Sequence, residues 1–269
     1  MRKIYYYETD LQNIKVAFYV LMLAIVITLI SVFIISPELN DSGSDCVPGN
    51  YTNDIFNTDA IYTHKIILFG DSLIEKPTNL YGMPTSILNR LQSKYPTLSF
   101  EMISSGIGGN SISELRARLC PDVISRQPEA VIMYWDSDIS DSSVDYSLSD
   151  EGINAYKRNL NYVIESLIHR VRFLAIAGPE LIGELPYGQN PKDKCLNLYQ
   201  DINRNISLSY NITYIDIRQQ FLDEDKYKGW DQYSGYLTID GEHPSLIGSK
   251  IEENLFTQQL IKWYQNVKK

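Results

Sequence analysis

Residues 65–73 read KIILFGDSL, the most informative stretch of the chain for its fold. Its first part, residues 65–69, is a short apolar run of the kind that forms a strand buried on both faces of a sheet. Gly70, Asp71 and Ser72 follow at once, so the serine stands directly after the strand. In open α/β sheets, ligands bind beyond the carboxyl ends of the strands. The stretch therefore predicts a first strand that carries a polar group at the functional edge of a sheet.

The chain beyond this stretch alternates short apolar runs with amphipathic segments. We expect further strands over residues 98–103, 130–135, 173–177 and 212–217. Helices are expected over residues 83–95, 112–119, 151–169, 193–209 and 245–267. This alternation predicts a parallel, five-stranded sheet in a three-layer α/β/α domain spanning residues 61–269.

Ahead of the domain, residues 16–35 read VAFYVLMLAIVITLISVFII, with only Thr28 and Ser31 as mildly polar interruptions. As a helix this run is about 30 Å long, the thickness of a bilayer's hydrocarbon core. Buried helices of globular proteins are rarely apolar on every face for this length. The run exceeds the apolar part of a signal peptide, and no A-x-A-like cleavage site follows it. We expect a transmembrane signal-anchor helix over residues 16–36.

Charges on either side of this span predict its orientation. Basic residues precede it and acidic residues follow it: Arg2, Lys3 and Lys15, then Glu38, Asp41 and Asp45. The positive-inside rule then makes residues 1–15 a cytoplasmic tail, in a single-pass, type II topology with a luminal or extracellular domain. Residues 37–60 are rich in Gly, Pro, Asn, Asp and Ser, as expected of a polar stalk.

Other features agree with an oxidising, non-cytoplasmic side. Four glycosylation sequons begin at Asn40, Asn50, Asn205 and Asn211. The three cysteines, Cys46, Cys120 and Cys195, allow one disulfide and one free thiol, and the sequence does not choose the pair. We expect no structural zinc site, because no C-x-x-C pair or histidine cluster occurs.

The overall charge restricts the partners. Lys and Arg number 24 against 33 Asp and Glu, a net charge of −9, whereas a binder of phosphate backbones needs a basic surface. We therefore expect no nucleic-acid partner. The 44% hydrophobic and 21% charged residues exclude wholesale disorder.

A second polar motif, Asp240-Gly241-Glu242-His243-Pro244, stands just before the last expected helix. An aspartate three positions before a histidine can hold one ring nitrogen while the other faces a nucleophile. The other histidines, His64 and His169, stand where we expect solvated side chains.

Residues 69–73 (FGDSL), taken with Asp240-x-x-His243, resemble the SGNH hydrolase superfamily of GDSL esterases and lipases. The likeness spans residue 65 to about residue 265. It implies a flavodoxin-like fold, with Ser72 as nucleophile, His243 as general base and Asp240 as the residue that orients the histidine. It implies no metal or organic cofactor. Asp71 is expected to cap a helix or brace the turn rather than to take part in catalysis.

The resemblance also implies an oxyanion hole. Gly109, in residues 104–111 (SSGIGGNS), best matches the glycine whose backbone N–H serves there, beside the N–H of Ser72. The family's third block normally reads Gly-x-Asn-Asp, and its asparagine is a further donor. This chain has Ser137 at that place, with a shorter reach than an amide, and Asn110 is a candidate substitute. Losing one such donor lowers the rate of other hydrolases by about 10²–10³.

Two groups of residues leave alternatives open. Aromatic residues ahead of Asp240 either line a substrate pocket, by stacking on a sugar or forming an acyl slot, or simply pack a long loop: Tyr227, Trp230, Tyr233 and Tyr236. The acidic series after residue 135 could bind a cation, but it lacks the glycine and final glutamate of a calcium loop, so a solvated acidic loop is favoured: Asp136, Asp138, Asp141 and Asp145.

The resulting expectation is a serine ester hydrolase acting on O-acetyl groups of glycans or on short-chain or lipid esters. The alternatives are an O-acyltransferase with the same three residues and a catalytically silent binding module on a membrane stalk. The expected partners are a small-molecule or glycan ester and the membrane.

Overall fold

The computed structural model describes residues 62–75, 82–183, 185, 188–228 and 235–267, except for the side chains of residues 225–228 and 267. The predicted tail (1–15), anchor (16–36) and stalk (37–60) lie outside these residues. Within the described ranges, every helix is too short or too polar to cross a bilayer.

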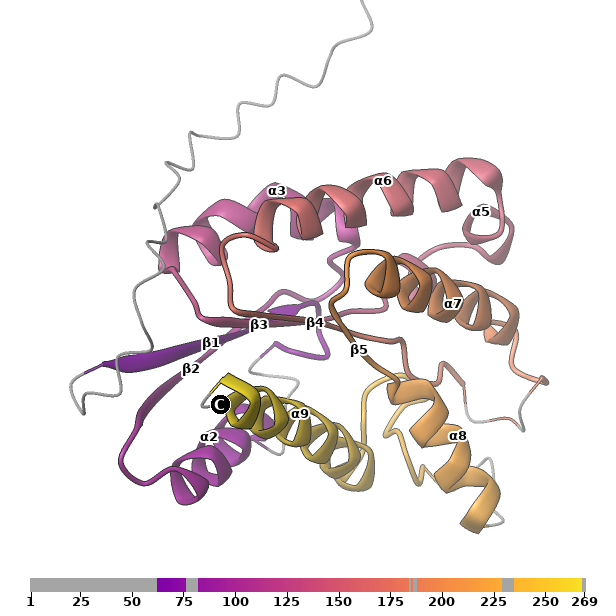
Figure 1. Ribbon diagram of the computed structural model, residues 1–269. Coiled ribbons are helices and arrows are strands. Elements are labelled where there is room, and N and C mark those ends of the chain that lie inside the picture. The colour runs from indigo at the N-terminus through magenta and orange to yellow at the C-terminus, as the bar shows by residue number, and fades with distance from the viewer. Residues whose placement is uncertain (1–61, 76–81, 184, 186–187, 229–234, 268–269) are drawn as a thin grey trace, which may run out of the picture. The chain divides into compact units, whose positions relative to one another are not determined.

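The centre of the fold is a five-stranded parallel sheet in the order β2-β1-β3-β4-β5, which confirms the expected sheet (Figure 1). Its strands are β1 (Thr63–Gly70), β2 (Ser99–Gly106), β3 (Ala130–Tyr134), β4 (Phe173–Ala177) and β5 (Thr213–Ile215). Gly70 pairs with Gly106 on one side and with Tyr134 on the other. The carboxyl ends of β1, β2 and β3 therefore stop level with one another, at the edge where the motifs lie.

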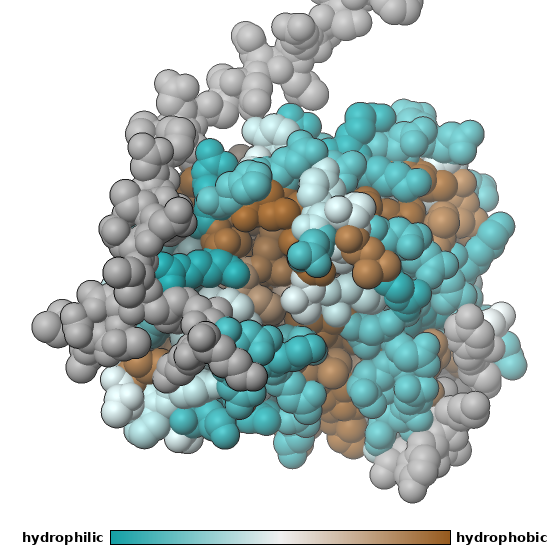
Figure 2. Space-filling model, viewed as in Figure 1, coloured by the Kyte–Doolittle hydropathy of each residue, from teal (hydrophilic) through white to brown (hydrophobic). Residues whose placement is uncertain are grey.

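Helices cover both faces of the sheet (Figure 1). One face carries α2 (Met83–Lys94), α8 (Ile217–Lys228) and α9 (Leu246–Val267), and the other carries α3 (Ile112–Asp122), α6 (Asp150–Leu167) and α7 (Asp193–Ser209). Shorter segments are the 3₁₀ helix η1 (Ile124–Arg126), α4 (Ser137–Ser140) and α5 (Val144–Ser147). On the face seen in Figure 2, hydrophilic residues cover most of the surface and apolar residues show in separate patches.

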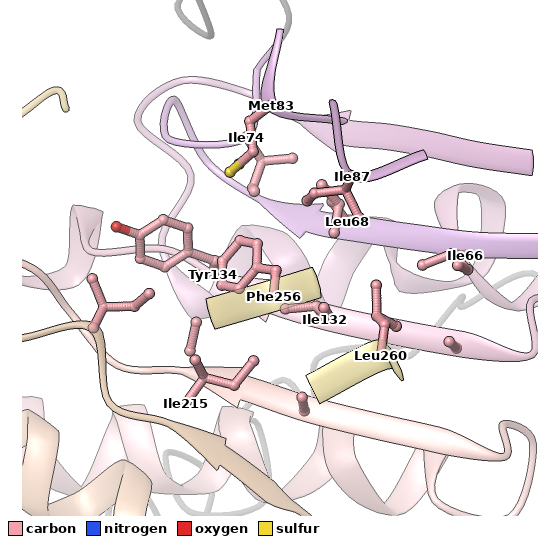
Figure 3. Close-up of a cluster of buried hydrophobic side chains, with 14 of the residues drawn as sticks. Ile66, Leu68, Ile74, Met83, Ile87, Ile132, Tyr134, Ile215, Phe256 and Leu260 are labelled. Carbon is pink, nitrogen blue, oxygen red and sulfur yellow. The ribbon is translucent and has the colours of Figure 1, made fainter. Parts of the chain in front are cut away.

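Alternate residues of each strand enter different cores, because successive side chains of a strand point to opposite faces. Ile66 and Leu68 of β1 join Ile132 of β3 and Phe256 of α9 in the first core (Figure 3). Ile67 and Phe69 point the other way, into a second core formed with α3, α6 and α7. Residues 66–69 are fully buried, as expected of a central strand covered on both faces.

Away from the motifs, the structure differs from the expectations at three places. Tyr227 was placed either in a substrate pocket or in a long loop ahead of Asp240, but α8 runs to Lys228 and includes this residue. Because that helix begins at Ile217, β5 is confined to Thr213–Ile215 instead of residues 212–217. His64 is not solvated: it is 1% exposed, and its Nδ1 lies 2.7 Å from the Glu129 carboxylate.

Candidate active site

Ser72 is presented at the carboxyl end of β1 by a close approach between two strands. A Cβ atom on Gly70 would lie 1.7 Å from the Tyr134 carbonyl oxygen, so only glycine fits there. Beyond Gly70 the chain turns, and the N–H of Glu75 donates to the Asp71 carbonyl over 3.0 Å. The serine side chain is thereby held on a turn at the sheet edge.

The Asp240–His243 turn, which precedes α9, is closed by the aspartate itself. Asp240 Oδ1 accepts the N–H of Glu242 (3.0 Å) and of His243 (2.7 Å). Its Oδ2 lies 2.7 Å from His243 Nδ1. Burial acts to raise the pKa of Asp240, but these hydrogen bonds outweigh burial and leave the pKa below its ordinary value. The turn therefore holds an ionised carboxylate against the imidazole.

The structure brings Ser72 and His243 together across the fold, although they are 171 positions apart. His243 Nε2 lies 3.1 Å from Ser72 Oγ. When Nδ1 donates to Asp240, Nε2 carries no hydrogen and can accept the serine hydroxyl proton. The three residues predicted from their motifs thus form one continuous series of hydrogen bonds.

The loop after β2 lies against the serine. A Cβ atom on Gly108 would lie 3.6 Å from Ser72 Cβ, and the Gly108 N–H donates to Glu75 Oε2 over 3.1 Å. Gly109, the predicted oxyanion residue, has a φ of +73°, a conformation that L side chains rarely adopt. The loop therefore brings a glycine backbone beside Ser72.

Arg118 of α3 holds this loop, a role that sequence reasoning missed. Its Nη2 donates to the Gly70 carbonyl over 2.5 Å and its Nη1 to the Ser105 carbonyl over 3.1 Å. Its Nε donates to Asn110 Oδ1 over 2.7 Å, so that amide is turned toward the guanidinium. Arg118 thus joins the ends of β1 and β2 to the glycine loop. Arg118 is far along the chain from residues 69–73 and 240–244, so nothing in the sequence indicated this role.

Ser137 lies beside the site, but its hydroxyl has another partner. Ser137 Oγ is buried and donates to Asp71 Oδ2 over 2.7 Å. The same oxygen accepts the N–H of Asp136 (2.9 Å) and of Ser137 (3.0 Å), and Asp71 Oδ1 accepts the N–H of Leu73 (3.1 Å). The expected brace at Asp71 is present, and it occupies the hydroxyl hydrogen that was expected to face an oxyanion.

The expectation of a solvated acidic loop after β3 is wrong for Asp136, which is 1% exposed. Asp138 Oδ2 accepts the Ile112 N–H over 2.7 Å and the Trp135 ring N–H over 3.0 Å, so it ties the start of α3 to the end of β3. Burial raises the pKa of Asp138 to about 6. Burial, together with the neighbouring Asp71, raises the pKa of Asp136 well above its ordinary value.

The other predicted residues fall in three places. Trp230 and Tyr233 lie outside the described residues, as does the side chain of Tyr227. The Tyr236 hydroxyl donates to Glu224 Oε1 over 2.9 Å, which joins the segment ahead of Asp240 to α8. Of the sequon asparagines, Asn205 and Asn211 are exposed at the end of α7, and Asn40 and Asn50 lie outside the described ranges.

Several proteins that this chain resembles are acetylxylan esterases. The sequence matches no protein-family model. It is 24% identical over 190 residues to an acetylxylan esterase from Geobacillus stearothermophilus, covering 69% of this chain and 84% of that protein. The crystal structure of an acetylxylan esterase from the same organism has a TM-score of 0.61 at 23% identity, covering 72% of this chain and 93% of that one. Another acetyl xylan esterase, AlAXEase, has a TM-score of 0.64 at 27% identity, covering 72% and 98% of the two chains.

The sheet, the serine at its edge and these likenesses define a carboxylic ester hydrolase. Within that class, these likenesses support the SGNH superfamily of GDSL-type esterases, which residues 69–73 and Asp240-x-x-His243 resemble.

Proposed function

We propose that this esterase hydrolyses acetyl and other short-chain esters, with Ser72 as nucleophile, His243 as general base and Asp240 as the residue that orients the imidazole. The observation that carries the proposal is the pair of contacts at His243. Its Nε2 lies 3.1 Å from Ser72 Oγ and its Nδ1 2.7 Å from Asp240 Oδ2. A nucleophile, a base and an orienting carboxylate in hydrogen-bond reach of one another are the arrangement that acyl transfer to serine requires.

In the first half of the reaction, Ser72 Oγ attacks the ester carbonyl carbon while its proton passes to His243 Nε2. The tetrahedral intermediate then collapses, and the imidazolium returns that proton to the departing alcohol oxygen. In the second half, water gives its proton to His243 and attacks the acyl carbon, which releases the acid and restores the serine. Asp240 stays ionised throughout, in keeping with its lowered pKa.

The backbone N–H groups of Ser72 and Gly109 would stabilise the oxyanion. Support comes from the contact of the glycine loop with Ser72 and from the left-handed conformation of Gly109. The Ser137 hydroxyl is not given this role, because it donates to Asp71. Its backbone and Asp71 instead fix the turn from which Ser72 acts.

The names of the similar proteins support an O-acetyl group on a glycan as the substrate of this chain, because they refer to acetylated xylan. Structures of catalytic mutants of the Geobacillus enzyme replace a serine, an aspartate and a histidine, with the aspartate three positions before the histidine. Ser72, Asp240 and His243 are the same residue types, with the same spacing between the last two.

The site of action that we propose is the luminal or extracellular face of a membrane, with residues 16–36 as anchor. Cys120 is disulfide-bonded, which favours an oxidising compartment, while Cys195 is a buried free thiol. The exposure of Asn205 and Asn211 allows glycosylation on that face.

The full chain in detergent, treated with a fluorophosphonate probe and assayed on 4-nitrophenyl acetate and acetylated xylo-oligosaccharides, tests the reaction. The parent should be labelled and should release acetate. Ser72→Ala should not be labelled, and His243→Ala should lose about 10³-fold or more in turnover. Ser125→Ala, on the exposed side of η1, should behave as the parent.

A folded parent that neither takes the label nor turns over ester would contradict the proposal and favour a silent binding module. Labelling without release of acetate, but with acetyl transfer to a sugar hydroxyl, would make the protein an acyltransferase.

A further inference from the structure

We propose that Arg218, acting through Asp193 and Asn190, is a positioning residue for His243. The inference rests on the proposed function, because it assigns these residues to the turn that carries Asp240 and His243. The link runs through the connection between β4 and α7, residues 178–192, which we call the strap. Only its described residues, 178–183, 185 and 188–192, enter the argument.

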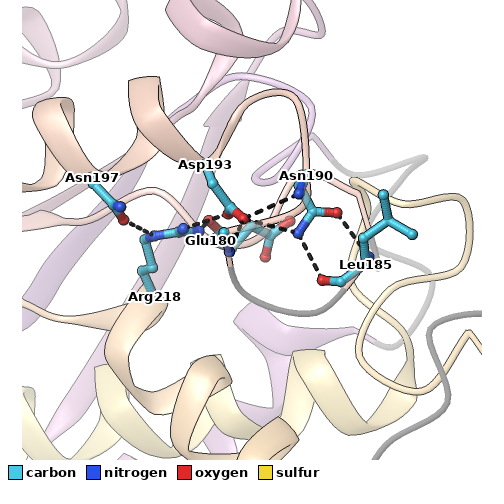
Figure 4. Close-up of polar contacts among 7 residues, drawn as sticks. Glu180, Leu185, Asn190, Asp193, Asn197 and Arg218 are labelled. Atoms are coloured by element: carbon cyan, nitrogen blue, oxygen red, sulfur yellow. Dashed lines mark hydrogen bonds and ion pairs between the residues drawn. The ribbon is translucent and has the colours of Figure 1, made fainter.

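Arg218 stands in the first turn of α8 with its side chain entirely buried. A buried guanidinium needs partners for its fork of donors, because it has lost its hydration. Nη2 donates to Asp193 Oδ1 over 2.7 Å, Nη1 to the Glu180 carbonyl over 3.1 Å, and Nε to Asn197 Oδ1 over 3.1 Å (Figure 4). Arg218 thus holds the beginning of the strap and the beginning of α7 at once.

Asp193 connects Arg218 to Asn190, because its two oxygens bind different partners. Its second oxygen, Oδ2, accepts the Gly188 N–H over 2.7 Å and the Asn190 side-chain N–H over 3.3 Å (Figure 4). The Asn190 side chain in turn forms two hydrogen bonds of 2.8 Å with the backbone of Leu185, accepting its N–H and donating to its carbonyl. Both side chains are at least nine-tenths buried, so the strap is fixed from within rather than by surface contacts.

Among the described residues of the strap, Gly183 contacts the Asp240–His243 turn. The Gly183 N–H donates to the Gly241 carbonyl over 2.6 Å. A Cβ atom on Gly183 would lie 2.6 Å from Asn190 Oδ1, so the asparagine packs directly against the backbone that makes this bond. Gly241 lies between Asp240 and His243 with a φ of +91°. Any displacement of Gly183 therefore moves the peptide that joins the orienting carboxylate to the base.

This series of contacts gives the buried Arg218 a role at the site, although it does not contact Ser72 or His243 in the hydrogen bonds described above. Arg218 forms an ion pair with Asp193 through Oδ1, so Asp193 Oδ2 is available to accept hydrogen bonds from the strap. The strap in turn donates from the Gly183 N–H to the Gly241 carbonyl. The expected effect is on the rate of the chemical steps rather than on substrate binding, because the distance from His243 to Ser72 and Asp240 is what the strap controls.

The test uses Asn190→Ala in the full chain, since removing Arg218 itself could prevent folding. The matched control is Asn203→Ala, which removes another buried asparagine, one of α7 that accepts the hydroxyl of Tyr156 in α6. Both variants should lower the Tm. Asn190→Ala alone should lower kcat on 4-nitrophenyl acetate, by about tenfold or more, with KM unchanged.

Hydrogen–deuterium exchange gives a second reading that does not depend on esterase activity. The peptide covering residues 238–246 should exchange faster in Asn190→Ala than in the parent or in Asn203→Ala. Equal protection of this peptide in all three proteins would overturn the inference, as would equal kcat values in the two variants of an active enzyme. If the parent shows no turnover, the proposed function fails and the exchange experiment still decides whether the strap positions the turn.

Discussion

Asp71 is the residue on which the surroundings of Ser72 most depend. It accepts the N–H groups of Leu73, Asp136 and Ser137 and the hydroxyl of Ser137. Burial raises the pKa of Asp71, and these four hydrogen bonds offset part of that rise. The side chain therefore joins the turn after β1 to the turn after β3, and Ser137 is one of its donors.

The role of Ser137 can be separated from that of an oxyanion donor by Ser137→Ala. We expect kcat to fall by less than tenfold and the unfolding free energy to fall by about 1 kcal/mol, because Asp71 keeps its backbone donors. Asp71→Asn should lower the unfolding free energy more, by about 2–3 kcal/mol, because asparagine has one oxygen to accept the hydrogen bonds that both carboxylate oxygens of Asp71 accept. Chemical denaturation and ester turnover measure both quantities. A loss of about 10²–10³ in kcat for Ser137→Ala would show that the hydroxyl acts on the oxyanion instead.

Residue types at short spacing were readable from the sequence, and contacts between distant residues were not. Asp240 and His243 are three positions apart, so their pairing follows from one turn. Ser137 and Asp71 are 66 positions apart, and nothing local indicates that they meet. A serine in place of the expected asparagine therefore indicated a lost donor, but its new partner came only from the structure.

At the scale of elements, β3, α9 and the strap meet at a buried pair of glutamates. The Tyr134 hydroxyl lies 2.8 Å from Glu180 Oε2 and 2.8 Å from Glu252 Oε1. A phenol has one hydrogen to donate, so one of the two glutamates must be a protonated acid that donates to the phenol oxygen. Burial raises the pKa of Glu252 to about 7 and, with the neighbouring Glu252, raises that of Glu180 well above its ordinary value.

The raised pKa of Glu252 predicts a loss of stability as the pH rises toward neutrality. The folded state holds the proton more tightly than the unfolded state, so its stabilising effect is complete below about pH 4.5. The unfolding free energy should then fall as the pH rises through about 7. In Glu252→Gln the unfolding free energy should depend less on pH, so the variant should become more stable relative to the parent as the pH rises. Urea denaturation between pH 5 and 8 measures this dependence.

The control for this prediction is Glu253→Gln on the same helix, where the carboxylate faces Arg90 over 2.9 Å. It should keep the slope of the parent. Identical slopes in the parent and in Glu252→Gln would mean that Glu252 is not the group that titrates.

Elements with strong periodicity were predicted well, and α8 was not. β4 and α7 have the expected ends, because β4 is a short continuous apolar run and the apolar residues of α7 repeat at the period of a helix. The sequence of α8, IRQQFLDEDKYK, has few apolar positions, and it buries Arg218 as well as Ile217 and Phe221. Burial of charged groups at Arg218, Glu180 and Glu252 depends on partners from other elements, so the sequence alone assigns such residues to the surface.

At the scale of the whole molecule, the described part of the chain is a parallel sheet with a candidate site at its edge, and the proposed place of action rests on the N-terminal segment. The net charge of −9 gives the chain as a whole no electrostatic attraction to anionic lipid surfaces. Residues 16–36 are then the feature expected to keep the esterase at a membrane, and the order of charges around them sets the side.

This topology predicts that the full chain stays in the membrane pellet after alkaline carbonate extraction, whereas a variant lacking residues 16–36 enters the supernatant. In sealed vesicles with their cytoplasmic face outward, added protease should remove an epitope placed before Met1 and spare one placed after Lys269. Detergent should expose the second epitope, which controls for its intrinsic sensitivity to protease. Protection of the first epitope and loss of the second would reverse the orientation. The domain would then face the reducing cytoplasm, where the disulfide at Cys120 would not be expected to persist.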